Sequence, residues 1–279
     1  MLLLLRIGGQ TLLYECCGQK RKRRGMCTLL ILNRPGNAWP MILGANRDEM
    51  AGRPWTAPGP HWPDRPGVVA GRDDLAGGSW LGVNALGVAA AMLNRQGTLG
   101  PAKDKRSRGE LVLLALDQED AAQAALVMSE LNPGAYRPFN MVVADASGAF
   151  YVAHRAEDRA PAIRRLGSGL TMLTSREPDD PASPRIAHYR AKFASAAAPD
   201  PDRGDFAAWE ALMASGERAP GVGPEGAMCI ATPSGFGTVS GALIALPAQN
   251  AGSGAKARAQ FRFAAGPPDR TKFRPVDLG

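Results

Sequence analysis

Two stretches early in the chain decide the fold: Met26-Cys27-Thr28-Leu29-Leu30-Ile31-Leu32-Asn33 and Gly44-Ala45-Asn46-Arg47-Asp48-Glu49. An apolar run, Pro40–Ala45, leads into the second stretch, and Arg34-Pro35-Gly36-Asn37 before it has the residues of a tight turn. Apolar runs without polar alternation are typical of strands that are buried on both faces. The sequence therefore predicts a buried hairpin in which Cys27 begins one strand and four polar residues follow the end of the other.

Beyond this hairpin, strands and helices come in separate groups. Further strands are predicted for Val68–Gly71, Ser79–Val83, Gly87–Leu93, Phe139–Ala144, Ala149–Ala153, Ala162–Leu166, Leu170–Thr174, Ala227–Ala231, Thr238–Leu246 and Gln260–Ala264. Helices are predicted for Leu111–Leu116, for Glu119–Leu131, for Pro184 to about Ala197, and between Asp205 and Gly216. Ala227–Ala231 and Thr238–Leu246 are expected to form a closing hairpin.

Local signals place the helix starts and define the fold class. Ser107 and Glu110 have the spacing of a capping box, and Pro184 suits the first turn of a helix that Ser183 caps. The proline-rich stretch Ala51–Gly67 cannot be helical and is predicted to be a surface loop. Groups of strands followed by groups of helices favour antiparallel sheets over alternating βαβ units. The predicted fold is α+β, a four-layer αββα sandwich of antiparallel sheets, with a two-layer α+β domain as the alternative.

Composition and charge restrict the class of protein. The chain has 279 residues, of which 45% are apolar, so it can bury a sizeable core. Its net charge is +7, but residues 1–25 carry six basic residues against one acidic residue, and without them the charge is +2. A positive field that depends on one terminal segment does not make a nucleic-acid-binding face. No apolar run reaches the roughly 18 residues of a membrane span, so we expect neither nucleic-acid binding nor membrane insertion.

The segment Met1–Gly25 is predicted to be separate from a single domain that covers residues 26–279. Its apolar start precedes its basic cluster, Lys20–Arg24, which is the reverse of a secretory signal. Three interpretations stay open: translation that begins at Met26, a disordered basic leader, or a propeptide that is cleaved.

The four cysteines, Cys16, Cys17, Cys27 and Cys229, have the spacing of neither a metal-binding pair nor a disulfide framework. His61, His154 and His188 are isolated, so we expect no metal, no cofactor and a reducing, cytoplasmic environment.

Cys27 is the strongest candidate for chemistry. If translation begins at Met26, removal of the initiator methionine leaves Cys27 as the first residue, with a thiol and a free α-amine. The pKa of such an amine lies near 8, so it can act as the general base for its own thiol without a histidine. The alternative is a buried apolar cysteine at the start of a strand, which is a common environment for this residue.

The polar residues that follow the second strand can complete such a site. Asp48 can orient the α-amine and stabilise its ammonium form, and Arg47 can lower the thiol pKa or bind an acidic substrate group. Asn94, near the end of a later strand, can donate its amide to an oxyanion. The alternatives are a solvated, salt-bridged strand end for residues 46–49 and ordinary turn chemistry for Asn94.

Several motifs occur together in a fixed order. They are Met26-Cys27, Ala45-Asn46-Arg47-Asp48-Glu49, Gly77-Gly78-Ser79-Trp80-Leu81-Gly82, Asn84 with Gly87 and Leu93-Asn94, Ser107-Arg108-Gly109-Glu110-Leu111-Val112, Phe139-Asn140 and Phe236-Gly237-Thr238-Val239-Ser240. From Met26 to about Pro247 the chain thereby resembles the NRDE family, the family of the transport and Golgi organisation protein 2. Members of that family are linked to lipid and acyl-CoA handling and to haem trafficking.

These motifs are also similar to those of N-terminal nucleophile hydrolases of the choloylglycine hydrolase and penicillin acylase type, where Gly-Arg-Asn-x-Asp follows the nucleophilic cysteine. The resemblance implies that Asp48 is the catalytic aspartate and that Asn94 is the oxyanion-hole asparagine. Ala45 stands at the arginine position, Ser175 replaces a second asparagine, and the last catalytic arginine has no counterpart. Around the catalytic residues Cys27, Asp48 and Asn94, substrate binding is expected from Asn46, Arg47, Glu49, Trp80, Asn84 and Ser175.

Two functions therefore compete. In the first, an N-terminal Cys27 hydrolyses an amide or an acyl (thio)ester of a small hydrophobic metabolite. In the second, the same pocket binds and carries haem or an acyl metabolite without turnover, and the Cys27 thiolate can be a ligand. The substrate and the oligomeric state do not follow from the sequence.

Overall fold

The computed structural model describes residues 3–7, 10–14, 27–248 and 258–279. The predicted basic cluster at residues 20–24, Met26 and most of the loop predicted for Ala251–Ala259 lie outside these residues. Within the first 25 residues, β1 (Leu3–Ile7) and β2 (Gln10–Tyr14) pair as a two-stranded antiparallel sheet of their own.

Two larger antiparallel sheets form the body of the described chain. In spatial order, the seven-stranded sheet comprises β11 (Ala162–Arg165), β10 (Gly148–His154), β9 (Phe139–Asp145), β8 (Ala89–Asn94), β7 (Leu81–Asn84), β6 (Val68–Asp73) and β5 (Trp55–Gly59). The six-stranded sheet comprises β12 (Gly169–Leu173), β3 (Thr28–Asn33), β4 (Met41–Met50), β13 (Phe236–Leu246), β14 (Gln260–Ala264) and β15 (Arg274–Pro275).

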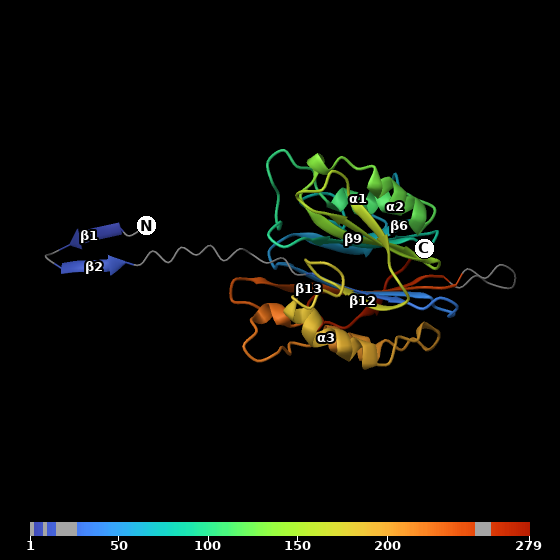
Figure 1. Ribbon diagram of the computed structural model, residues 1–279. Coiled ribbons are helices and arrows are strands. Elements are labelled where there is room, and N and C mark those ends of the chain that lie inside the picture. The colour runs from blue at the N-terminus through green and yellow to red at the C-terminus, as the bar shows by residue number, and fades with distance from the viewer. Residues whose placement is uncertain (1–2, 8–9, 15–26, 249–257) are drawn as a thin grey trace.

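Helices cover the outer face of each sheet, so the molecule has four layers, as Figure 1 shows. On the seven-stranded sheet lie α1 (Gly109–Leu116) and α2 (Ala121–Ser129), and on the six-stranded sheet lie α3 (Pro184–Ser195) and α4 (Ala207–Met213). Short 3-10 turns span Pro133–Ala135, Pro201–Arg203 and Pro224–Gly226. The predicted α+β class and αββα sandwich are confirmed. None of the helices in the described part of the chain has the length and apolar character that a membrane crossing requires.

The alternation of side chains along β3 and β4 explains why their apolar runs are continuous. Leu29 and Ile31 point into the core between the two sheets, whereas Leu30 packs against the helices α3 and α4. On β4, Leu43 points between the sheets and Ile42 toward the helices. Both faces of the hairpin are therefore buried, as predicted.

Strand β4 is longer than the sequence predicted. Residues 46–49 were expected after the end of the strand, but β4 continues through them to Met50 because β13 pairs with them, with Thr238 opposite Asp48. The polar side chains consequently alternate between the two faces of a central strand. This alternation determines which of them can meet Cys27.

Three local predictions were wrong. Ala227–Ala231 forms only an isolated bridge from Ala231 to Gly237, because side chains such as that of Thr238 take up its main-chain groups. Part of the predicted loop Ala51–Gly67 forms the edge strand β5, a position that tolerates its proline. The helix α1 begins at Gly109 without a side-chain cap, so the capping box is not formed.

Candidate active site

Cys27 lies directly before β3, next to the polar part of β4. Its side chain packs at the margin of the core between the sheets. The main-chain N–H of Asp48 donates to the Cys27 Sγ over 3.3 Å, and the thiol is 3.6 Å from the Asp48 carbonyl oxygen. Burial, reinforced by the nearby carboxylate of Asp48, raises the pKa of the Cys27 thiol to about 12. A cysteine in this environment is a neutral thiol at physiological pH unless the local charges change.

The carboxylate of Asp48 points the other way, toward the helix layer. Its Oδ2 accepts a hydrogen bond of 2.9 Å from Arg185 Nη1, and its Oδ1 accepts one of 2.6 Å from the Thr238 hydroxyl. Arg185 also donates to the Thr28 hydroxyl, which joins the ion pair to β3. Burial raises the pKa of Asp48, whereas the Arg185 charge and the Thr238 hydroxyl oppose this rise. A buried ion pair with Arg185 thus fixes the Asp48 side chain, while the main-chain N–H of the same residue contacts Cys27.

Arg185 is a residue that the sequence prediction missed. Its side chain has 0% exposure, and it lies near the start of α3 among the buried residues Ile186, Tyr189 and Phe193. Arg185 and Tyr189 are four residues apart, so they share the inward face of the helix. An arginine on the apolar face of an amphipathic helix was the signal that could have identified it.

Arg47 points into the space between the sheets. Its guanidinium lies 4.2 Å above the centre of the Trp80 ring, and its Nη2 is 3.6 Å from Asp73 Oδ2. Asp73 also accepts a 2.8 Å hydrogen bond from Arg53, which in turn lies 3.8 Å from Glu49. Burial lowers the pKa of Arg47, and a Cys27 thiolate, Glu49 and Asp73 oppose this shift. The stacked ring and the shared carboxylate hold the guanidinium beside Cys27.

The position of Trp80 depends on Gly71. A Cβ at residue 71 would lie 2.4 Å from the indole Cζ2 of Trp80, which is closer than any real contact. We therefore expect Gly71→Ala to displace the ring from beneath Arg47 and to destabilise the protein by about 1–3 kcal/mol in urea unfolding. Gly167→Ala is the control, since a methyl group there meets open space. Equal stabilities of the two variants would show that Trp80 has another way to fit.

Ser175 and Asn94 lie at the same end of the sandwich as Cys27. Leu173 pairs with Leu29 in the antiparallel register of β12 and β3, so Ser175 comes level with Cys27 when that register is extended by two residues. The Ser175 carbonyl accepts a 3.0 Å hydrogen bond from Gln96 N–H, just beyond Asn94. The end of β8 and the segment after β12 are therefore joined next to Cys27.

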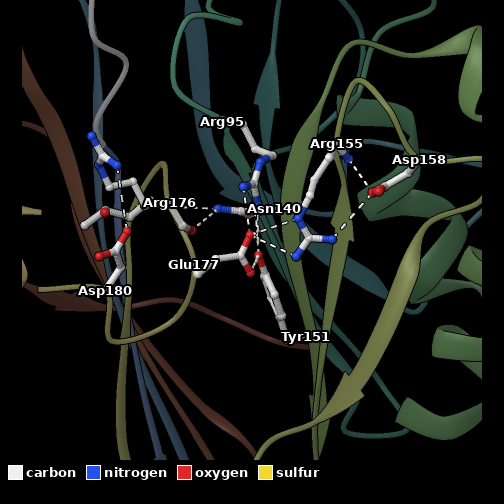
Figure 2. A network of polar contacts seen from close by, with 9 residues as sticks. Arg95, Asn140, Tyr151, Arg155, Asp158, Arg176, Glu177 and Asp180 are labelled. Carbon is white, nitrogen blue, oxygen red and sulfur yellow. Dashed lines mark hydrogen bonds and ion pairs between the residues drawn. The ribbon is translucent and has the colours of Figure 1, made fainter. Parts of the chain in front are cut away.

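A polar network holds these two segments together (Figure 2). Asn140, which has 0% exposure, donates to the carbonyl oxygens of Thr174 (2.9 Å) and Arg176 (2.6 Å) and accepts from Arg95 and Tyr151. Glu177 accepts 2.8 and 2.9 Å hydrogen bonds from Arg95 and Arg155. The carboxylate is shared by both arginines, which lowers the pKa of Glu177 against the effect of burial. This network links the seven-stranded sheet to the segment that carries Ser175.

Other predicted site residues serve the scaffold in this structure. Asn46 points toward the helices and donates to the Met213 and Met228 carbonyls, at 2.8 and 2.9 Å. Asn84 donates to the Leu116 and Gln118 carbonyls and accepts from two N–H groups of its own turn. The structure does not bring these two side chains to Cys27.

Two hollows lie at this end of the molecule. A cavity of about 20 Å³ has Cys27, Arg47, Trp80, Leu93 and Ser240 among its lining residues. A groove of about 460 Å³ is lined by Glu49, Met50, Gly52, Arg53, Leu75, Gly97, Leu99, Gly100 and Pro101. Arg47 lines the cavity and Glu49 lines the groove, and the two residues are two positions apart on β4, so both hollows border the same face of one strand.

The four-layer αββα sandwich of two antiparallel sheets is the architecture of the N-terminal nucleophile hydrolase fold. A structural comparison agrees: the Caenorhabditis elegans N-acylethanolamine-hydrolyzing acid amidase ortholog superposes with a TM-score of 0.50, 12% identity, and coverage of 78% of this chain and 92% of that one. At that identity the likeness concerns the fold alone.

The chain belongs to the Transport and Golgi organisation 2 family, whose model matches residues 26–215. The Transport and Golgi organization protein 2 homolog of Bos taurus is 33% identical over 141 residues, which cover 47% of this chain and 50% of the relative. The Homo sapiens homolog is 35% identical over 118 residues, which cover 40% of this chain and 41% of the relative. The chain thus spans half or less of the length of these relatives. The predicted family is confirmed.

Proposed function

We propose that this protein is an N-terminal-cysteine hydrolase that cleaves an amide or an acyl (thio)ester of a small hydrophobic metabolite. The observation that carries the proposal is the setting of Cys27: its sulfur accepts an N–H bond from Asp48 and lines a cavity between the sheets together with Arg47. The solved amidase with the same fold is named for hydrolysis of N-acylethanolamines, which adds support for acyl chemistry.

The proposed roles follow the chemistry of a chain that begins at Cys27. The Cys27 thiolate attacks the acyl carbon, and its own α-amine transfers protons. Asp48, whose main-chain N–H donates to the Cys27 sulfur, orients that amine. Asn94, one residue beyond Leu93 in the cavity wall, is the oxyanion donor that the sequence predicts. Ser175 and Trp80 complete the surroundings of the acyl group.

The groove beside the cavity supports a hydrophobic substrate. Its volume of about 460 Å³ falls within the range of small-molecule sites, and Leu75, Leu99 and Met50 supply apolar surface. Arg137 fixes one wall by donating to the carbonyl oxygens of Gly97, Leu99, Gly100 and Pro101. We propose that the acyl chain lies in this groove while its carbonyl group enters the cavity at Cys27.

A second candidate function is binding without turnover, as a carrier of an acyl metabolite or of haem. The specific observation in its favour is that the groove does not include Cys27, so a ligand can occupy it without reaching the thiol. Either function fits a role in lipid metabolism or haem trafficking. Since Cys27 and Cys229 are free thiols, we further propose a reducing, cytoplasmic setting.

Substitution of Cys27 separates the two functions. In a chain that begins at residue 27, we expect Cys27→Ala to abolish hydrolysis of a panel of N-acyl amides and acyl thioesters, and Cys27→Ser to reduce it at least about 10²-fold because an alcohol is a weaker nucleophile. Binding of a fluorescent fatty acid should persist in both variants. Wild-type turnover in Cys27→Ala contradicts the hydrolase. Saturable binding of the fatty acid or of haem, followed by the Soret band, without turnover by the wild type favours the carrier.

A further inference from the structure

Arg47, which lines the cavity beside Cys27, carries a charged nitrogen that has no hydrogen-bond partner among the described residues. Arg47 is only 7% exposed, and its Nη1 has no hydrogen-bond partner. The rest of its guanidinium is held, by the Trp80 ring at 4.2 Å and by Asp73 at 3.6 Å from Nη2. Leaving a buried charged donor unpaired is costly, so this arrangement favours a ligand atom at Nη1.

The size of the cavity limits what that ligand is. A volume of about 20 Å³ accommodates one water-sized group. A carboxylate or phosphate binds arginine best through two parallel hydrogen bonds, but Asp73 already occupies the Nη2 side. The open site therefore suits a single oxygen atom that bears negative charge.

The direction of Asn94 strengthens this assignment. On β8, Ala91 and Leu93 point into the core between the sheets, and Met92 packs against the helices α1 and α2. Alternation along the strand places the Asn94 side chain on the helix side, away from the cavity. Arg47, by contrast, lines the cavity together with Cys27.

We propose that Arg47 Nη1–H, and not the Asn94 amide, stabilises the oxyanion that forms when Cys27 attacks an acyl group. This inference rests on the proposed hydrolase function and changes the residue that carries one of its steps. Effective oxyanion stabilisation requires a donor that is held in place before the reaction. Arg47 meets this requirement, because Trp80 and Asp73 fix the position of its positive charge.

Acylation of Cys27 and hydrolysis of the resulting thioester pass through the same kind of oxyanion. The Cys27 thiolate forms a C–S bond, and the π electron pair of the carbonyl moves onto its oxygen, which accepts a hydrogen bond from Arg47 without taking its proton. The bond to the leaving group then breaks, and the leaving group takes a proton from the α-ammonium group of Cys27. A water molecule attacks the thioester with the α-amine as base, the same oxyanion forms again, and the acid and the thiolate are released.

Two reactions of the same thiol test the proposal. Acylation by p-nitrophenyl acetate builds an oxyanion, whereas alkylation by iodoacetamide does not. In chains that begin at Cys27, we expect Arg47→Met to slow acylation by about 10²–10³-fold. The alkylation rates of the thiolate forms of the variant and the wild type should differ by no more than about threefold, as expected for a modest shift in thiol pKa. The first p-nitrophenolate release and mass spectrometry at Cys27 give the two rates.

Further variants keep the test decisive. Arg47→Gln has a neutral donor and should show a smaller loss of acylation, and it replaces Arg47→Met if that variant does not fold. Arg65→Met is the matched control, since Arg65 pairs with Asp64 and Asp117 and lines neither hollow. Its acylation and alkylation rates should equal those of the wild type.

Two outcomes overturn the proposal. A parallel fall of acylation and alkylation in Arg47→Met shows that Arg47 acts only on the thiol. Unchanged acylation in Arg47→Met, with a large loss in Asn94→Ala, returns the oxyanion to Asn94. Failure of the wild-type chain to turn over any amide or thioester refutes the hydrolase function separately, because the ratio of the two reactions still measures the effect of Arg47.

Discussion

Cys27 at the first position of the chain is expected to react with iodoacetamide at pH 8 about 10³-fold faster than Cys27 in the full 279-residue chain. Within a longer chain, burial and Asp48 raise the pKa of this thiol to about 12. On the order of one thiol in 10⁴ is then ionised at pH 8. A free α-amine supplies a base and, when protonated, a positive charge beside the sulfur, so the thiolate population rises. Hydrolase activity should follow the same difference.

The comparison needs three chains: the full sequence, one that begins at Cys27, and one with a single glycine inserted before Cys27. The third keeps almost every contact of the second but moves the α-amine away from the sulfur. Alkylation must be followed at Cys27 by peptide mass spectrometry, because Cys16, Cys17 and Cys229 are further thiols. For the inserted chain we expect the slow rate, and the rate in the full chain should rise tenfold per pH unit up to about pH 11. Equal rates in all three chains would exclude the amine as the base.

Arg185→Met is expected to lower the free energy of unfolding by about 3–5 kcal/mol. The Arg185–Asp48 pair is 2.9 Å long and both side chains have 0% exposure. Removing the guanidinium leaves the buried Asp48 carboxylate with the Thr238 hydroxyl as its remaining side-chain partner among the described residues, and Thr28 loses its donor. The loss comes mainly from the unpaired charge that remains and not from the strength of the original pair. Urea unfolding followed by circular dichroism measures it.

Two further variants assign the loss to the buried charge. Arg190→Met removes an exposed arginine of the same helix that pairs with Asp179 at 2.7 Å, and it should cost less than about 1 kcal/mol. Adding Asp48→Asn to Arg185→Met should recover about 1–3 kcal/mol, because the amide needs no counter-charge. If Arg185→Met lowers stability as little as Arg190→Met does, the ion pair with Arg185 is not what stabilises the buried Asp48 carboxylate.

The features that the sequence predicted correctly depend on neighbours in the chain. The turn at Arg34–Asn37 joins β3 to β4, and Pro184 begins α3. The hairpin β9–β10 turns at Asp145–Gly148, where Asp145 accepts from the N–H groups of the turn. In each case residues within a few positions supply the conformational restraint, so the local sequence is sufficient.

Side-chain contacts outside the local pattern explain the wrong prediction at Ala227–Ala231 and the residue that the sequence prediction missed, Arg185. Met228 and Ile230 are apolar enough for a strand, but their main-chain groups are satisfied by the side chains of Asn46, which is 182 residues away, and of Thr238, which is eight residues away. The buried Arg185 finds Asp48 across a separation of 137 residues. A local sequence pattern cannot predict a partner that lies so far along the chain.

By itself, the sequence determined the family, the fold class and the presence of Cys27 at the start of a buried hairpin strand, followed in the next strand by Asn46-Arg47-Asp48-Glu49. Only the tertiary structure decided which of these polar residues faces which layer. Both faces of β4 are buried, so its apolar pattern leaves the orientation of the strand undetermined. Pairing with β3 and β13 sets Asp48 toward Arg185 and Arg47 toward Cys27, and that choice separates the residue held in the buried ion pair from the one that lines the cavity beside Cys27.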